Sequence, residues 1–210
     1  MIDQFNRVLV LAPHTDDGEI GAGGFISKLK RNGAEVDYVA FSSCEESVPE
    51  GFKKDILKEE VKKATDKLNI DSLRVLDFKV RYFSYHRQEI LEEMINIRKL
   101  KNYDLVLVPS SQDIHQDHKT IYDEAVRAFK GTSVFGYELP WNQLYTSNSI
   151  FIKLELTDVN NKIEALNEYQ SQKGRTYCSD KFIRSFALVK GAMCGMEYAE
   201  SYEMIRLFVR

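Results

Sequence analysis

Two short polar runs hold most of the side chains in this chain that are suited to metal or acid–base chemistry. They are APHTDD at residues 12–17 and HQDH at residues 115–118, and they contain three of the four histidines. Each run directly follows an apolar stretch that is typical of a buried strand, at residues 7–11 and 105–109. The carboxyl ends of parallel strands converge on one crevice of an α/β sheet. We therefore expect the two runs to form one site.

The residue types in these runs match the ligands of a catalytic zinc ion. Two imidazoles and one carboxylate form a common zinc site, and three protein ligands leave one coordination position for water. A metal ion held in this way lowers the pKa of its bound water to about 7 and polarises a substrate carbonyl. A second carboxylate beside the ion can accept the proton of that water, which typically contributes roughly 10²–10⁴-fold to the rate. The sequence therefore predicts a metal-dependent hydrolase.

The segment APHTDDGEIGAGG, followed by HQDH, resembles the PIG-L/LmbE-like family of zinc-dependent N-deacetylases, which remove acetyl groups from N-acetylglucosamine-type substrates. Further similarity lies in residues 135–142, 165–172 and 197–202, so the resemblance covers essentially the whole chain. Carried over residue by residue, it implies these roles: His14, Asp17 and His118 as metal ligands, Asp16 as the general base, His115 as the group that stabilises the oxyanion, and Asp117 as its orienting partner.

The chemistry of these positions agrees with the implied roles. Adjacent side chains point in different directions, so Asp16 can face the bound water while its neighbour binds the metal. His115 and His118 are three residues apart and share a face of a helical turn. One can bind metal while the other, held protonated by Asp117, donates to the oxyanion. Zinc is favoured by these ligands, although iron or cobalt suits the same set.

Two positions depart from the family pattern. The family usually has Pro after the first histidine and Glu after the paired aspartates, where this chain has Thr15 and Gly18. Neither is a ligand position in the scheme above. Gly18 removes a carboxylate near the site, and Glu19 is displaced from that place by one residue. We expect the metal ligands to be retained and their tuning to differ.

Three further residues are candidates for substrate binding. Arg81 and Arg87 follow the third predicted strand, in a loop at the same end of the sheet as the metal residues. They are candidates for sugar or phosphate contacts, with plain solvated arginines as the equal alternative. Trp141 is the only tryptophan and offers a stacking face for a sugar ring, with core packing as the equal alternative. The glycine-rich residues 21–24 fall inside a helical pattern and indicate close helix packing rather than a nucleotide loop.

Strand-like and helix-like patterns alternate along the chain. Strands are predicted at residues 7–11, 36–41, 74–78, 103–108, 133–137 and 149–154, and helices at 18–31, 57–68, 90–97, 118–129, 159–172 and 180–190. Repeated strand–helix units imply right-handed crossovers and a largely parallel sheet. We expect a single α/β domain over residues 1–210, with a Rossmann-like three-layer fold and helices on both faces of the sheet.

The composition of the chain limits the classes of partner and the compartment to be expected. A net charge of −3 and the lack of a Lys/Arg stripe argue against a nucleic-acid binder. No window approaches the roughly 20 apolar residues of an integral membrane span. Three separated cysteines form no disulfide framework, so a cytoplasmic location is expected. The expected partner is a small N-acetylated sugar or glycoconjugate, and a homo-oligomer is compatible with the sequence.

Two other classes of function remain open on the sequence alone. A receiver-type signalling domain also carries paired acidic residues after its first strand, and Asp77 resembles its acceptor site. That interpretation leaves the histidines of the two polar runs without a role. A non-catalytic sugar-binding module on the same fold is the second alternative. Retention of both Asp16 and His115 weighs against it, because binding alone needs neither a base nor an oxyanion donor.

Overall fold

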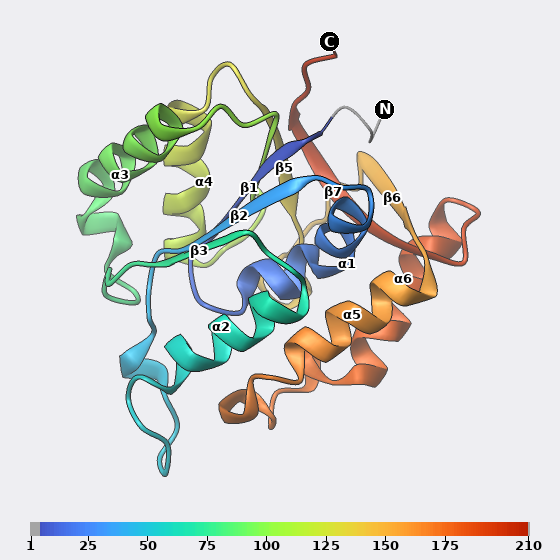
Figure 1. Ribbon diagram of the computed structural model, residues 1–210, viewed down its shortest axis with the longest axis horizontal. Coiled ribbons are helices and arrows are strands. Elements are labelled where there is room, and N and C mark those ends of the chain that lie inside the picture. The colour runs from blue at the N-terminus through green and yellow to red at the C-terminus, as the bar shows by residue number, and fades with distance from the viewer. Residues whose placement is uncertain (1–4, 210) are drawn as a thin grey trace.

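The structure, a computed structural model, describes residues 5–209 and contains one mixed β-sheet (Figure 1). Its strands in this part of the chain are β1 (Arg7–Ala12), β2 (Glu35–Ala40), β3 (Ser72–Val75), β4 (Leu105–Pro109), β5 (Ser133–Tyr137), β6 (Ile150–Leu154) and β7 (Tyr198–Arg206). The spatial order is β3-β2-β1-β4-β5-β7-β6. Strands β1 to β5 run parallel, and β7 is antiparallel to both of its neighbours.

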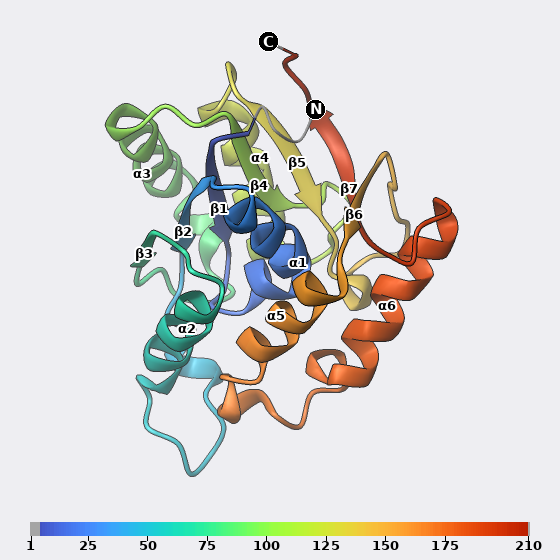
Figure 2. The same ribbon diagram turned by 45° about the vertical axis from the view of Figure 1, so that its right-hand side comes forward.

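Helices cover both faces of this sheet. They are α1 (Asp17–Arg31), α2 (Ile56–Lys67), α3 (Arg87–Leu100), α4 (Gln116–Ala128), α5 (Leu156–Leu166) and α6 (Asp180–Met193). Figure 1 shows α3 and α4 together on one face, and Figure 2 shows α5 and α6 on the same side as α1. The predicted three-layer α/β fold with a largely parallel sheet is confirmed. Within residues 5–209, no helix combines the length and apolar character required to cross a membrane.

The two central strands explain why the polar runs follow continuous apolar stretches. Alternate side chains of β1 and β4 enter different cores, because successive residues of a strand point to opposite faces. The core beneath α3 and α4 receives Leu9, Leu11, Val106 and Val108. The core beneath α1 receives Val8, Val10, Leu105 and Leu107. Strands buried on both faces read as unbroken hydrophobic runs, as in these segments.

The connections that leave β1 and β4 place the candidate site. The chain leaves β1 through α1 on one face and leaves β4 through α4 on the other face. The carboxyl ends of these adjacent strands therefore border a crevice at the point where the winding of the sheet reverses. Both polar runs lie there, at the amino-terminal ends of α1 and α4.

Three elements differ from those predicted. Strand β3 ends at Val75, so residues 76–78 lie outside it. Helix α5 ends at Leu166, because Tyr169 turns its hydroxyl into the core toward the backbone oxygen of Thr15. Strand β7 was not predicted at all, and its partners β5 and β6 are distant in the sequence. The last two differences reflect contacts with remote residues that local periodicity does not encode.

Glycines in α1 allow close packing, as the sequence indicated. A methyl group at Gly21 would overlap the ring of Tyr137, a fully buried residue of β5. A methyl group at Gly24 would lie 2.5 Å from Leu154 and 2.9 Å from a carboxylate oxygen of Glu200. These approaches seat α1 directly against β5, β6 and β7, so the helix whose first turn carries Asp17 is held firmly.

We predict that Gly21→Ala destabilises the protein by about 1–3 kcal/mol, the usual cost of overpacking a filled core. Gly131→Ala is the control, because a methyl group there would meet no heavy atom within 4 Å. Urea unfolding of the two variants and the parent measures the difference in free energy of unfolding. Equal stability of all three proteins would contradict the packing argument.

Candidate metal centre and active site

Three donor atoms from the two polar runs form a nearly equilateral triangle. The Nδ1 atom of His14 lies 3.0 Å from Oδ2 of Asp17, and Nε2 of His118 lies 3.2 Å from that oxygen. The two nitrogens are 3.1 Å apart. A tetrahedral ion with ligand bonds of about 2.0–2.1 Å has ligand-to-ligand edges of about 3.3 Å. The triangle therefore fits one small divalent ion after a slight expansion.

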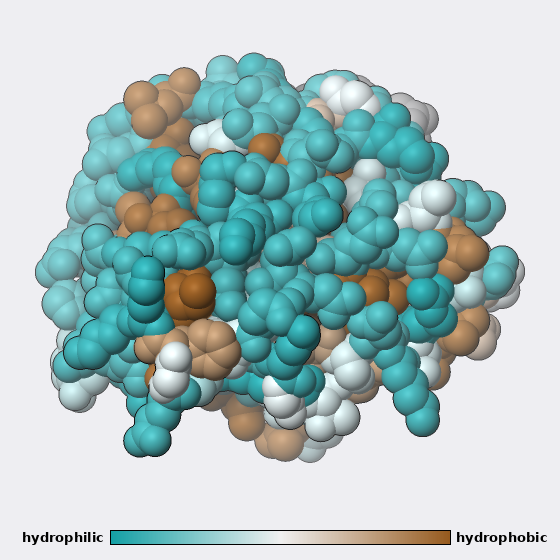
Figure 3. Space-filling model, turned by 60° about the horizontal axis from the view of Figure 1, so that its bottom comes forward, coloured by the Kyte–Doolittle hydropathy of each residue, from teal (hydrophilic) through white to brown (hydrophobic). Residues whose placement is uncertain are grey.

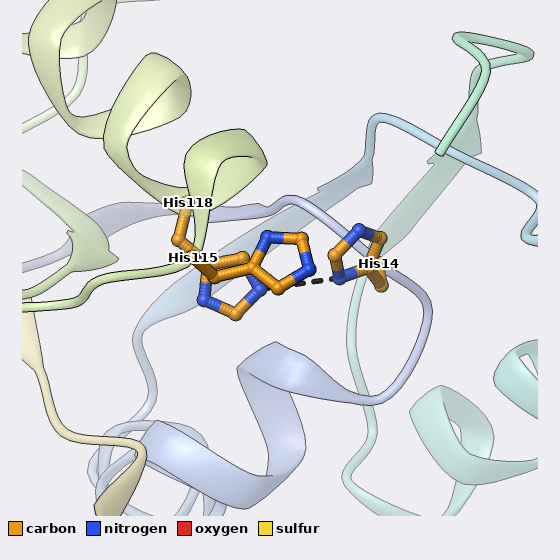
Figure 4. Close-up of side chains that lie close together, drawn as sticks. All are labelled: His14, His115 and His118. Atoms are coloured by element: carbon orange, nitrogen blue, oxygen red, sulfur yellow. Dashed lines mark hydrogen bonds between the residues drawn. The ribbon is translucent and has the colours of Figure 1, made fainter. Parts of the chain in front are cut away.

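His115 lies beside this triangle and widens the cluster. Within the described part of the chain, ligand atoms of His14, His115 and His118 all lie within 4.8 Å of one another. Figure 4 shows the three rings gathered together, with the contact between His118 and His14 drawn as a dashed line. The Nδ1 atom of His115 accepts the backbone N–H of Asp117 at 3.2 Å. Because that lone pair is used and the carboxylate of Asp17 contacts both of the other donors, at 3.0 and 3.2 Å, we assign Asp17 to the third ligand position.

Two buried carboxylates hold the ligand imidazoles in place. Oδ2 of Asp117 lies 3.1 Å from Nε2 of His14, and Oδ2 of Asp113 lies 2.7 Å from Nδ1 of His118. Such a carboxylate contact on one ring nitrogen fixes the tautomer and turns the other nitrogen toward a metal. Asp113 lies four residues after β4, and it is not among the site residues predicted from the sequence.

The position of Asp117 corrects one expectation. Its carboxylate was expected to orient His115, yet it contacts His14 and accepts the backbone N–H groups of Arg81 at 2.6 Å and Phe83 at 3.3 Å. Asp117 follows Gln116, the first residue of α4, so its side chain reaches across to β1 and to the loop after β3. It belongs to the support of His14.

The charges around the triangle favour a bound cation. Burial alone would raise the pKa of Asp17, but His118 and His14 outweigh it and hold that pKa well below the usual value. Burial alone would lower the pKa of His14, but the charge of Asp17 and hydrogen bonds to Asp117 and Asp17 raise it. In the same way Asp17 and Asp113 overcome burial at His118 and raise its pKa to about 10. Surroundings that stabilise added protons on two imidazoles also stabilise a metal ion in their place.

His115 has the opposite electrostatic character. Burial, followed by the charges of His118 and His14, lowers the pKa of His115 to about 4. This low pKa differs from the expectation of a protonated His115, because the two neighbouring imidazoles have raised pKa values and the carboxylate of Asp117 contacts His14 instead. With Nδ1 accepting a backbone N–H, the neutral ring carries its proton on Nε2. His115 remains a hydrogen-bond donor, as a neutral imidazole.

Asp16 lines the cavity beside the triangle, with 8% of its surface exposed. It occupies the N-cap position of α1, yet its side chain makes no capping hydrogen bond. The carboxylate is thus not consumed by the helix terminus. Burial and the charge of Asp17 raise its pKa, while Arg175 and His14 act in the opposite direction. A raised pKa makes a carboxylate a better proton acceptor.

Glu19 secures the loop that departs from the family pattern. Its buried carboxyl group accepts hydrogen bonds from the hydroxyls of Tyr38 at 2.5 Å and Tyr169 at 2.8 Å, and both hydroxyls also contact the backbone oxygen of Thr15. Burial raises the pKa of Glu19 to about 8. A side chain at Gly18 would meet the ring of Tyr38. Glu19 thus does not replace the absent carboxylate in the cavity and instead fixes the loop from behind.

A cavity of about 250 Å³ opens beside the metal triangle. Two of the three predicted substrate contacts, Arg81 and Trp141, line it. Trp141 lies in a short helix (η4, Pro140–Asn142) and stacks on Tyr177, with ring centroids 3.7 Å apart. Arg81 adopts a positive φ of 70°, and its backbone N–H is held by Asp117.

Arg87 does not reach the cavity. Its guanidinium binds Glu124, a fully buried residue of α4, with Nε at 2.6 Å and Nη2 at 2.5 Å from the same carboxylate oxygen. A second carboxylate, that of Asp123, lies 3.8 Å from Nη2. Arg87 therefore ties the start of α3 to α4, and the predicted substrate contact is not supported.

Part of the cavity wall consists of residues that no sequence pattern indicated. Gln172, Arg175 and Tyr177 come from the segment after α5, where the sequence predicted a helix up to Gln172 and no functional residue beyond it. Only the tertiary fold brings this segment to the carboxyl ends of β1 and β4. In Figure 3, the face of the molecule that comes forward is mostly hydrophilic, with small separate hydrophobic areas.

A donor set of two histidines and one carboxylate at the switch point of an α/β sheet is the arrangement expected of a metal-dependent hydrolase. The model of the PIG-L family, described as GlcNAc-PI de-N-acetylase, matches residues 9–129, which is more than half of the chain. The chain belongs to the PIG-L family. The resemblance inferred from the sequence is thereby confirmed, and the predicted class of enzyme, a hydrolase of N-acetyl amides, agrees with it.

Individual relatives share this similarity over nearly the whole chain. A diacetylchitobiose deacetylase from Thermococcus kodakarensis is 25% identical over 222 residues, covering 95% of this chain and 83% of that protein. The structure of an N,N'-diacetylchitobiose deacetylase from Pyrococcus horikoshii has a TM-score of 0.78 at 19% identity, covering 97% and 85%. A 4-carboxy-2-hydroxymuconate hydratase from Pseudomonas putida has the same TM-score of 0.78 at 19% identity, covering 98% of each chain. The fold therefore occurs with more than one chemistry.

We expect the purified protein to contain about one divalent metal ion per chain. The double variant His14→Ala/His118→Ala removes two of the three donor atoms and should reduce the metal content nearly to zero. His86→Ala is the matched control, because His86 lies outside the cluster and contacts Glu89 at 3.0 Å. Metal analysis by mass spectrometry decides the matter, and full metal content in the double variant would contradict the assignment.

Metal binding should also release protons. After removal of metal with a chelator, His118 has a pKa of about 10 and carries a proton that an incoming ion must displace. The apparent metal affinity should therefore increase as the pH rises through the neutral range. Calorimetric titrations in buffers of different ionisation enthalpy count the released protons. An affinity independent of pH, with no proton released, would contradict the charge assignment.

Proposed function

We propose that this protein is a metal-dependent N-deacetylase that hydrolyses the acetamide of an N-acetylglucosamine-type sugar or glycoconjugate to acetate and a free amine. The observation that carries the proposal is the triangle of His14, Asp17 and His118 with Asp16 and His115 beside it on one cavity. This arrangement provides a metal site, a base and an oxyanion donor within one space. Membership of the family supports the choice of reaction.

The metal is proposed to be zinc, held by His14, Asp17 and His118. Two imidazoles, one carboxylate and an open position match zinc in hydrolases, although ferrous iron suits the same ligands. When bound, the ion would polarise the acetamide carbonyl and make a water molecule more acidic. Asp113 and Asp117 keep the two imidazoles aligned by holding their outer nitrogens.

Asp16 takes the proton from the attacking water in this scheme. Its carboxylate faces the cavity, makes no capping bond and has a raised pKa, which suits proton transfer near neutral pH. The same group can then deliver the proton to the leaving amine. This sequence of transfers returns Asp16 to its starting state after each turnover.

His115 stabilises the negative charge that develops on the former carbonyl oxygen. Its neutral ring has the proton on Nε2, the nitrogen left over once Nδ1 accepts the backbone N–H of Asp117. A neutral donor aimed at the oxyanion strengthens only as that charge forms, and therefore lowers the barrier rather than the ground state. Asp117 assists indirectly, through His14 and through its own backbone N–H.

The two alternative classes of function are not favoured. A phospho-acceptor role needs Asp77 in a sheltered site, but the Asp77 side chain is 74% exposed and lies 3.0 Å from Nζ of Lys58. A non-catalytic sugar-binding module does not need a carboxylate such as that of Asp16, which makes no capping hydrogen bond and lies beside the metal triangle. Acetate release separates this second alternative from the proposed enzyme.

The compartment and the assembly stay predictions. All three cysteines, Cys44, Cys178 and Cys194, are free thiols, as expected for a cytoplasmic protein. The proposed partner is the small N-acetylated substrate, and a homo-oligomer remains compatible with the chain.

The basic test of function is incubation of zinc-loaded protein with a panel of N-acetylated sugars, with measurement of acetate and free amine. No release from any member, including glycoconjugates, would contradict the proposal.

Asp16→Asn should keep the metal and the fold but lose most turnover, by about 10²–10⁴-fold in kcat. The amide is nearly isosteric with the carboxylate but cannot accept the proton of the attacking water. Asp77→Asn serves as the control, because it makes the same change at an exposed aspartate. Steady-state kinetics with metal analysis measures the effect, and undiminished kcat in Asp16→Asn would assign the base to another residue.

His115→Ala should retain metal and lose about 10²–10³-fold in kcat, the range for one oxyanion donor. Because the pKa of His115 is about 4, its protonated form exists only in acid, and the loss should be uniform between about pH 6 and pH 9. Parallel pH–rate profiles of the variant and the parent test this. Loss of metal would make His115 a ligand, and removal of the high-pH limb would show that it acts as a cation.

A further inference from the structure

Gln172 lines the cavity and has a buried hydrogen-bond acceptor without a partner. The residue is only 3% exposed and belongs to a short helix (η5, Gln170–Gln172) that follows α5. Its Oε1 atom is buried and has no hydrogen-bond partner, while its side chain lines the cavity beside the metal triangle. Buried acceptors without a partner are rare in folded proteins, and each one calls for an explanation. A ligand donor is a direct explanation for this one.

Hydrogen bonds to Ser171 fix which atom of the Gln172 amide is left without a partner. Glu60 of α2 is buried and accepts both the backbone N–H of Ser171 at 2.9 Å and its hydroxyl at 2.5 Å. A hydroxyl has one proton, so Ser171 Oγ can then only accept. The amide of Gln172 must therefore turn its NH₂ group toward Ser171, which it contacts at 3.0 Å. Oε1 is left pointing away from this relay.

The neighbours of Gln172 in the cavity suit a sugar. The stacked pair of Trp141 and Tyr177 provides a flat aromatic wall, and Arg175 donates to the hydroxyl of Tyr177 at 2.6 Å. Sugars combine apolar ring faces with hydroxyl groups, and each hydroxyl can donate one hydrogen bond. An aromatic wall with a fixed acceptor beside it matches that combination.

We propose that Gln172 is a substrate-binding residue whose Oε1 atom accepts a hydrogen bond from one hydroxyl of the sugar, held in position by the relay from Glu60 through Ser171. This inference rests on the proposed deacetylase function, whose substrate it describes more closely. A buried acceptor left unpaired discriminates strongly against a ligand that lacks the matching donor. Gln172 thus selects for a hydroxyl at one ring position.

The test is a cycle between a protein variant and altered sugars. Gln172→Met keeps the length of the side chain and withdraws the acceptor, and Gln170→Met makes the same change at an exposed position of the same short helix. Binding of N-acetylglucosamine and its 3-deoxy, 4-deoxy and 6-deoxy forms is measured by calorimetry. Zinc-loaded protein carrying Asp16→Asn is used in every case, so that no turnover interferes.

We expect Gln172→Met to weaken binding of N-acetylglucosamine by about tenfold, which corresponds to the loss of roughly one hydrogen bond. One deoxy sugar lacks the hydroxyl that Gln172 contacts, and the variant and the parent protein should bind this sugar with equal affinity. Gln170→Met should bind all four sugars like the parent protein. A loss of the same size for every sugar would overturn the proposal, because it would indicate a purely structural role. If Gln172→Met does not fold, Gln172→Asn withdraws the same acceptor by one methylene and is compared with the same sugars.

The contact made by Gln172 and the proposed reaction are tested by separate measurements. Acetate release by the protein without the Asp16 substitution tests the deacetylase function, whereas the binding cycle reads only the contact made by Gln172. Release of acetate without selective coupling to one hydroxyl would refute the role of Gln172 alone. Selective coupling without acetate release would refute the reaction and leave the contact in place.

Discussion

The structure depends above all on the contacts between buried carboxylates and two imidazoles at the carboxyl ends of β1 and β4. His14 and His118 contact each other, and Asp17 lies against both of them. Asp117 and Asp113 hold the outer nitrogens. Three carboxylates around two imidazoles leave a local excess of negative charge, which a divalent ion offsets. Buried charges of this kind are tolerated only when they are paired or bind a metal.

The remainder of the fold keeps this cluster rigid. Glycines bring α1 close to the sheet, and the polar loop before it is fastened by Glu19 through Tyr38 and Tyr169. Its counterpart α4 is tied to α3 by the ion pair between Arg87 and Glu124. Both helices begin at the site, so packing along their lengths fixes donor atoms at their ends. Precision of this kind is what a preorganised catalytic site requires.

The cavity has two walls of different origin. The metal donors, Asp16 and His115 lie within residues 9–129, the part that matches the family. The rest of the lining includes Trp141 and Gln172, which lie beyond that part. In the proposed scheme, the reaction chemistry is therefore carried by the first stretch of the chain, and the second stretch contributes part of the sugar-binding wall. This division accommodates one reaction on different substrates, since the second stretch can vary without disturbing the metal site.

The sequence by itself determined the alternation of strands and helices and the convergence of two polar runs, because buried parallel strands and helix faces leave local periodic patterns. It did not determine β7, the partners of Asp117 or the low pKa of His115. Those depend on which groups approach from distant parts of the chain and on how deeply they are buried. For the same reason, Arg87 was predicted to contact the substrate but does not line the cavity, whereas Gln172 was not predicted and does line it. Only tertiary packing decides whether an arginine contacts a buried glutamate, or whether the amide oxygen of a cavity-lining residue is left without a partner.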